Sequence, residues 1–204
     1  ELTTVQPMTP NPGHLFFTRQ RVPLGLGHAV WCARRFIADE PFAVLLPDDL
    51  ILATPGCLKQ MVDAHQAIGG NLVAVEDVPR EETNRYGILE VESDDGWLAK
   101  ARGLVEKPKP DEAPSTLSII GRYILPYDIF DILELTKPGI NNEIQLTDAI
   151  RSLIGEIGVL GYQFAESHFD VGTPIGLLKA SIHESMQIPE FANEIKSFMS
   201  FFKD

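Results

Sequence analysis

The chain is 204 residues long, is 44% hydrophobic, and carries 17 basic against 29 acidic side chains, for a net charge of −12. Its length and apolar content suffice for one hydrophobic core, so we expect a single domain over residues 1–204. The acidic excess argues against nucleic acid as a partner, because phosphate backbones require a concentrated positive surface. Phosphorylated small molecules remain compatible, provided that a metal ion and a few local cations neutralise their phosphates.

The cysteines and the lengths of the apolar runs indicate the cellular compartment. The two cysteines, Cys32 and Cys57, fall in no metal-binding spacing, which fits a reducing cytoplasm. No apolar run is long enough to cross a bilayer, and the first residues lack the pattern of a signal peptide. We therefore expect a cytoplasmic protein with no membrane partner.

The first half of the chain alternates extended and helical patterns. After a loop rich in proline, a short apolar strand is predicted over residues 14–18. Apolar residues recur at helical spacing over 26–37, and a buried strand is predicted over 42–46. A helix over 54–68 and a buried strand over 71–75 repeat the alternation. This order favours an α/β fold with a parallel sheet.

The second half begins with a predicted β-hairpin and then returns to alternating strands and helices. The predicted elements are a hairpin insertion with strands over 87–91 and 99–105, a strand over 117–124, helices near 128–135 and 146–154, and a strand near 159–164. Thr173 followed by Pro174 then predicts a helix start, because threonine is a good cap and proline suits the first helical position.

A last helix is predicted over residues 188–204. One of its faces carries an apolar stripe of Ile188, Phe191, Ile195, Phe198 and Phe202. Packing of this stripe onto the domain is the first interpretation. Contact with another subunit is the second, since Met199 and Phe201 leave apolar surface on a second face, and it would make the protein a homo-oligomer.

Two acidic residues follow predicted strands. Asp48 comes after a buried apolar strand, where open α/β sheets place their ligand crevices, and a carboxylate there suits Mg²⁺. An Asp turn or a helix cap is the alternative. Asp170 precedes the capped helix start, again beside a strand end. The two acids would share one metal ion if their strands were neighbours in the sheet.

Three further features have weaker signals. Glu106 and Lys107 form a charged pair stiffened by Pro108, able to address sugar hydroxyls and a phosphate; a solvated surface pair is the alternative. Gly25-Leu-Gly27 permits close backbone approach before a helix, but it matches no dinucleotide or phosphate-loop fingerprint and is equally a tight turn. The histidines have no ligand spacing and receive no role: His14, His28, His65, His168 and His183.

Seven ordered segments over nearly the whole chain resemble a known family. They are 23–30, 45–49, 85–88, 105–108, 121–123, 143–148 and 169–172. Together they are similar to the sugar nucleotidyltransferase family, and within it to bacterial UTP-glucose-1-phosphate uridylyltransferases. The resemblance implies a Rossmann-like, mixed and mainly parallel sheet flanked by helices, of the nucleotide-diphospho-sugar transferase type.

The resemblance also implies a reaction and a role for each site residue. A uridylyl group would pass from UTP to glucose 1-phosphate, giving UDP-glucose and pyrophosphate, with Mg²⁺ as cofactor. The implied roles are uracil reading by Gln20 and Gly25, metal binding by Asp48 and Asp170, glucose contact by Gly87 and Glu106, and contact with the sugar phosphate by Lys107. Asp48, Lys107 and Asp170 would be the catalytic residues. Glu143 and Thr147-Asp148 would support the sugar pocket or cap a helix.

One part of the family pattern has no match. The family begins with a strand and a Gly-rich loop, containing Arg and Lys, that grips the triphosphate, so we expect an N-terminally incomplete domain and assign activity to the parent protein. A thymidylyltransferase or another sugar-1-phosphate nucleotidyltransferase is one alternative, and a non-catalytic sugar-nucleotide-binding subunit is another. The Gly-Leu-Gly-His-Ala turn favours the uridylyl branch.

Overall fold

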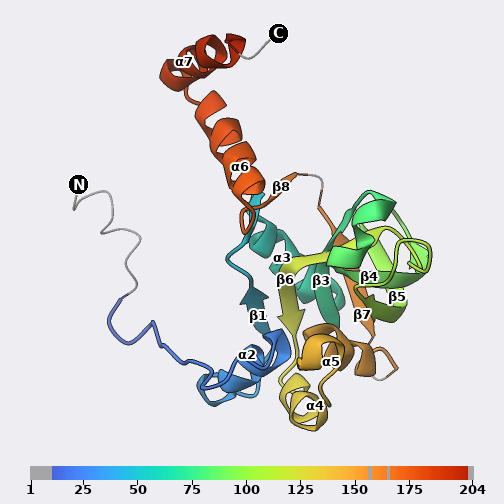
Figure 1. Ribbon diagram of the computed structural model, residues 1–204. Helices are drawn as coiled ribbons and strands as arrows, with labels where there is room; N and C mark the ends of the chain where they lie inside the picture. Colours follow the sequence, from blue (N-terminus) through green and yellow to red (C-terminus); the bar gives the residue numbers. More distant parts are fainter. Residues whose placement is uncertain (1–10, 156–157, 165, 202–204) are drawn as a thin grey trace.

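A six-stranded sheet lies at the centre of the protein (Figure 1). The computed structural model describes residues 11–155, 158–164 and 166–201. In spatial order the strands are β1 (Phe42–Leu45), β6 (Leu117–Leu125), β3 (Asn71–Asp77), β7 (Val159–Gln163), β5 (Leu98–Glu106) and β4 (Gly87–Asp94). A separate sheet pairs β2 (Asp49–Leu52) with β8 (Ser167–Asp170) in antiparallel fashion.

The central sheet is mixed, and its strands are mostly antiparallel, so the expected mainly parallel sheet is wrong. Among the described strands only β3 and β7 pair in parallel. The reason is the position of β6, which runs antiparallel between β1 and β3 and separates two strands that a helical connection joins. The broader expectation of a mixed α/β sheet flanked by helices is confirmed.

Helices cover both faces of the sheet. They are α2 (Leu26–Cys32), α3 (Cys57–Ile68), α4 (Ile129–Leu135), α5 (Leu146–Ser152), α6 (Pro174–Met186) and α7 (Pro189–Ser200), with short 3₁₀ turns η2 (Arg34–Phe36), η3 (Arg80–Arg85) and η4 (Ile140–Asn142). Across the part of the chain that the structure describes, no helix has both the length and the apolar character to span a bilayer.

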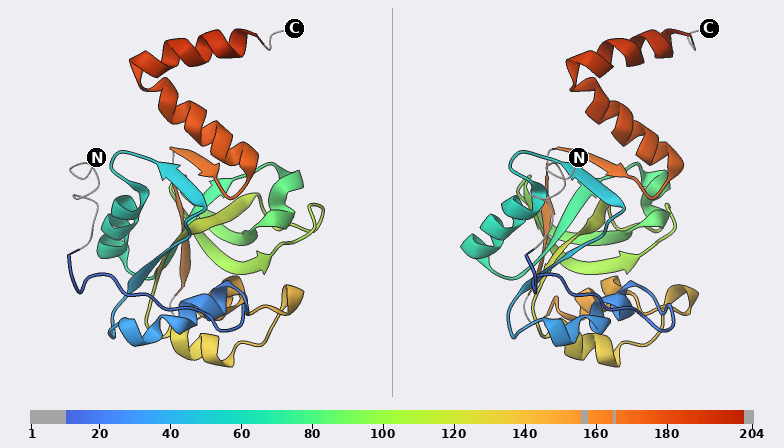
Figure 2. Two further views of the ribbon diagram at one scale, coloured as in Figure 1. Left: turned by 60° about the vertical axis from the view of Figure 1, so that its left-hand side comes forward. Right: turned by 90° about the vertical axis from the view of Figure 1, so that its left-hand side faces the viewer.

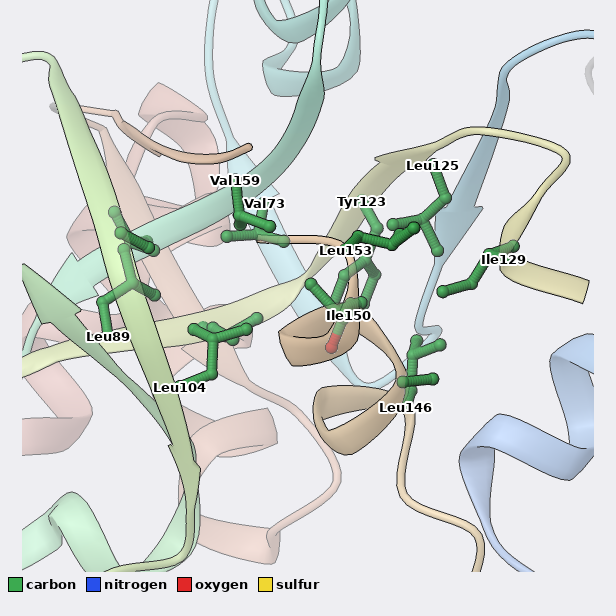
Figure 3. Packing of buried hydrophobic residues seen from close by; sticks show 14 of the residues in the cluster. Val73, Leu89, Leu104, Tyr123, Leu125, Ile129, Leu146, Ile150, Leu153 and Val159 are labelled. Carbon is green, nitrogen blue, oxygen red and sulfur yellow. The ribbon is translucent and has the colours of Figure 1, made fainter. Parts of the chain in front are cut away.

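Strand β3 shows how the two layers are built. Successive side chains of a strand point to opposite faces, and here both faces are covered. Val73 belongs to the larger core, which also contains Ile150 of α5 (Figure 3). Leu72 and Ala74 pack against Met61 of α3 on the other face. The apolar run predicted as a buried strand is therefore confirmed.

The predicted strand over residues 14–18 is wrong. Residues 12–24 contain no helix or strand, and Phe17 is 86% exposed. Phe16 instead stacks on Phe36, with ring centroids 5.4 Å apart. A strand needs a neighbour to satisfy its backbone hydrogen bonds, and this segment has none within the described residues.

Helices α6 and α7 project from the domain as an arm (Figure 2). The threonine cap predicted for α6 is present, with Oγ1 of Thr173 accepting from the N–H of Gly176 at 3.1 Å. Helix α6 packs on β8, and α7 packs on α6. Phe191 and Phe198 are 49% and 62% exposed, so the first interpretation, packing of the α7 stripe onto the domain, is wrong. Phe202 lies outside the described residues.

Candidate functional site

A cavity of about 330 Å³ gathers residues that are far apart in the sequence. Five of the predicted site residues line it, namely Asp48, Gly87, Glu106, Lys107 and Asp170. They come from the turn after β1, the starts or ends of β4 and β5, and the end of β8. The arrangement therefore places two acids and a Glu-Lys pair around one space.

The small sheet of β2 and β8 explains how the two acids meet. Asp49 pairs with Asp170 across its ladder, and the N–H of Val171 donates to the carbonyl oxygen of Asp48 at 2.7 Å. A Cβ atom at Gly172 would lie 3.2 Å from Oδ1 of Asp170 and 3.4 Å from Oδ2 of Asp48. Both carboxylates thus border the same small space, although their strands meet outside the central sheet.

This space fits a hard divalent cation. Mg²⁺ commonly takes one or two carboxylates and completes its coordination with water and phosphate oxygens. No cluster of three or more His, Cys, Asp or Glu able to hold a metal exists among the described residues. The carboxylate of Asp170 is already paired with a positive side chain. Nη2 of Arg85 donates to Oδ2 of Asp170 at 2.5 Å, and Nη1 of Arg85 donates to Oε2 of Glu82 at 3.2 Å. The two carboxylates are therefore the ligand type that Mg²⁺ takes, and one oxygen of Asp170 is already paired with Arg85.

His168, to which no role was assigned, ties β8 to its neighbours. Its side chain is 6% exposed, with Nε2 2.9 Å from Asp49 and Nδ1 2.7 Å from Glu76. Carboxylates only accept hydrogen bonds, so both ring nitrogens donate and the ring is protonated. Burial alone lowers the pKa of His168, but the hydrogen bonds to Asp49 and then Glu76 outweigh it and raise the pKa to about 9. Its partners lie 119 and 92 positions away, so local spacing held no signal for it.

The Glu-Lys pair turns into the cavity at the end of β5. Glu106 is only 12% exposed, and its Oε1 lies 3.6 Å from Nζ of Lys107, which is 38% exposed. Lys107 has a φ of 47°, a left-handed conformation that a non-glycine residue adopts at a cost of roughly 1–2 kcal/mol. Its N–H donates to the carbonyl oxygen of Tyr86 at 2.9 Å, which fixes the turn. Glu106 is therefore not a solvated surface residue, whereas Lys107 is exposed at the edge of the cavity.

Gly87 leaves the space that this pair needs. A Cβ atom there would lie 2.9 Å from Oγ1 of Thr147 and 3.2 Å from Oε2 of Glu106. Both distances are shorter than ordinary van der Waals contact, so a side chain at this position would displace the carboxylate. Thr147 itself lines the cavity, whereas Asp148 pairs with Arg151 on the surface of α5.

Gln20 and Gly25 lie beside the cavity without lining it. Leu26 and Glu143 do line it, and Gly25 lies directly behind them, with a would-be Cβ atom only 2.7 Å from Cβ of Glu143. The φ of Gly25 is 96°, so both conformation and space require glycine here. Nε2 of Gln20 donates to the carbonyl oxygen of Gly25 at 3.1 Å, which joins the two residues into one loop.

Comparison with known proteins identifies the class to which this fold and site belong. The family model described as nucleotidyl transferase matches residues 12–186, and the chain belongs to this family. It is 40% identical, over 186 residues, to UTP–glucose-1-phosphate uridylyltransferase of Staphylococcus epidermidis, an alignment that covers 91% of this chain and 65% of that protein. The chain thus spans less than two thirds of that relative's length.

Two solved structures extend the comparison. A crystal structure of UDP-glucose pyrophosphorylase complexed with UDP-glucose is 42% identical, with a TM-score of 0.80 over 83% of this chain and 65% of that one. The UTP-bound UGPase from Acinetobacter baumannii is 38% identical, with a TM-score of 0.77 over 89% of this chain and 64% of that one.

Proposed function

We propose that this protein transfers a uridylyl group from UTP to glucose 1-phosphate, forming UDP-glucose and pyrophosphate. The observation that carries the proposal is the cavity in which Asp48 and Asp170 border one space beside Glu106 and Lys107. Relatives bound to UDP-glucose and to UTP, the product and one substrate of this reaction, support it.

In the proposed reaction a phosphate oxygen of glucose 1-phosphate attacks the α-phosphorus of UTP, and pyrophosphate leaves with its electron pair. Asp48 and Asp170 would hold Mg²⁺, which when bound supplies positive charge to the reacting phosphates. Lys107 meets the sugar phosphate and screens its repulsion from UTP. Glu106 accepts hydrogen bonds from glucose hydroxyls. No protein nucleophile takes part, so the residues act by positioning and electrostatics.

The base end of the site is assigned to the loop beside the cavity. We propose that Gln20 reads uracil through its side-chain amide and that Gly25 reads it through its backbone. The support is their mutual hydrogen bond and the position of Gly25 behind Leu26 and Glu143, which line the cavity.

A homo-oligomer in the cytoplasm completes the proposal. The exposed phenylalanines of the arm, Phe191 and Phe198, would pack against another copy, since two helices of 13 and 12 residues bury little apolar surface by themselves. Sedimentation of a Phe191→Ser, Phe198→Ser variant tests this: we expect a smaller assembly, and an unchanged mass would contradict the arm's role.

Pyrophosphate release by the complete gene product tests the activity. Initial rates are measured with UTP and with dTTP, each with glucose 1-phosphate and Mg²⁺, and we expect UTP to be preferred. A clear preference for dTTP would replace the proposal with a thymidylyltransferase. Binding of UDP-glucose without turnover at saturating Mg²⁺ would identify a sugar-nucleotide-binding subunit instead.

A further inference from the structure

The side-chain amide of Gln20 has a determined orientation. Its Nε2 lies 3.1 Å from the carbonyl oxygen of Gly25 and 2.8 Å from Nδ1 of His28. A carbonyl oxygen can only accept a hydrogen bond, so the nitrogen of the amide, and not its oxygen, must face Gly25. The second hydrogen on the same nitrogen then points to His28. Nδ1 is therefore the acceptor, and the neutral ring carries its proton on Nε2.

Helix α2 holds the His28 ring in place for this contact. Trp31, three residues along the helix, stacks on it with centroids 5.8 Å apart and planes inclined by 21°. The guanidinium of Arg34 covers the Trp31 ring at 3.3 Å, so the stack is itself held. Sγ of Cys32 lies 3.9 Å from both ring nitrogens, a weak contact by comparison. The amide of Gln20 is thus the strong partner of Nδ1.

With both amide hydrogens engaged, only the oxygen of Gln20 remains for a ligand. Among the residues that the structure describes, no group donates a hydrogen bond to this Oε1 atom. A nucleobase read here must therefore present a donor. Uracil and thymine carry N3–H, whereas N3 of cytosine is an acceptor that would face the acceptor Oε1.

We propose that His28 is a positioning residue for base specificity: it fixes the Gln20 amide so that the site selects uracil over cytosine. The inference rests on the proposed function, and it names a residue that acts through Gln20 without touching the base. With His28 present, rotation of the amide breaks two hydrogen bonds, one to Gly25 and one to His28. Without His28, it breaks only the hydrogen bond to Gly25. Since a hydrogen bond contributes on the order of 1 kcal/mol, loss of the His28 contact should weaken the selection about five- to tenfold.

Three substitutions separate positioning from simple packing. His28→Phe keeps an aromatic ring against Trp31 but has no acceptor, and His28→Leu is a second variant without an acceptor. His28→Asn restores an acceptor close to the position of Nδ1. His65→Leu, on α3, is the control for loss of a histidine elsewhere. Circular dichroism establishes that each variant is folded.

The measured quantity is the ratio of kcat/KM for UTP to that for CTP, with glucose 1-phosphate, in the complete protein. We expect His28→Phe and His28→Leu to lower this ratio about five- to tenfold, mainly through a higher KM for UTP. His28→Asn and His65→Leu should retain it. An unchanged ratio in His28→Phe, or an equal loss in His28→Asn, would overturn the proposal.

The outcome stays separate from that of the proposed reaction. If the wild-type protein prefers dTTP, the uridylyl assignment fails, and the ratio is measured for dTTP against dCTP because thymine carries the same N3–H. If there is no turnover, calorimetric affinities for UDP-glucose and CDP-glucose replace the rates. A wild-type protein that binds the two equally would overturn the role of His28.

Discussion

The two ends of the candidate site are held in different ways. The acid end, with Asp48 and Asp170, is held by the backbone ladder of β2 and β8 and by the buried His168. The base end is one loop, from Gln20 to Gly25, held by the side-chain contact of Gln20 to His28 of the seven-residue helix α2 and by one backbone hydrogen bond, from the N–H of Ile144 to the carbonyl oxygen of Leu24. Residues 12–24, which include most of that loop, contain no helix or strand.

This difference assigns different tasks to the two ends. A metal site needs carboxylates fixed to a fraction of an ångström, and backbone ladders between distant segments supply such rigidity. A base reader has to distinguish one hydrogen-bonding edge from another, which one oriented amide achieves. We therefore expect changes at the acid end to affect rate and stability, and changes at the base end to affect selectivity.

The largest expected effect is loss of turnover at the acid end. Asp48→Asn or Asp170→Asn removes one charge from the space that the two carboxylates share, and the rate of Mg²⁺-dependent pyrophosphate release should fall at least about 100-fold. Asp63→Asn, on the exposed face of α3, is the matched control and should leave the rate unchanged. Near-normal activity of Asp48→Asn would show that Asp48 is not a metal ligand, and it would contradict the assignment of the acid end to metal binding.

His168 tests whether the acid end is the more rigid one. His168→Gln leaves the carboxylates of Asp49 and Glu76 without their charged donor, and the free energy of unfolding should fall by about 2 kcal/mol at pH 6. Urea titration measures it. Because the folded-state pKa of His168 is raised to about 9, its contribution is fully present below pH 6.5 and disappears as the pH rises through 9.

The difference between the wild type and His168→Gln should accordingly be much smaller at pH 10 than at pH 6. An equal difference at both values would show that packing, and not the charged hydrogen bonds, holds β8 in place.

Arg85 tests the metal space without any substrate. Its guanidinium competes for Asp170, so Arg85→Gln should raise the affinity of the protein for Mn²⁺ about fivefold, as measured by electron paramagnetic resonance of the free ion. Arg151→Gln, which breaks a surface ion pair on α5, is the control. Weaker binding by Arg85→Gln would mean that Arg85 supports the site and does not compete with the ion.

The elements of the fold were predictable where the signal is local. The apolar run of β3 and the capped start of α6 were located because periodicity and capping act within a few residues. The strand order was not, because the place of β6 between β1 and β3 depends on contacts across the chain. Strands β2 and β8 were missed because four residues that include aspartate or histidine show no period.

The site was predictable to a similar degree. Asp48, Glu106 and Lys107 each follow a strand, and a ligand-facing position could be inferred from that alone. Arg85 and His168 act through partners 85 and 119 positions away, and no local pattern marks such pairs. Sequence position therefore indicated which acids face the cavity, and the structure adds the groups that orient them.

The smallest expected effect is a difference in the labelling of the two cysteine thiols. Cys32 lies at the base end beside His28 and is partly exposed, whereas Cys57 is buried at the start of α3. Burial raises the pKa of Cys57 to about 11, so at pH 8 it stays a neutral thiol and cannot act as a nucleophile. A thiol-reactive dye at pH 8 should therefore label one cysteine per chain in the native protein and two in urea. Peptide mapping should place the native label on Cys32, and rapid native labelling of Cys57 would show that α3 opens as readily as the base end.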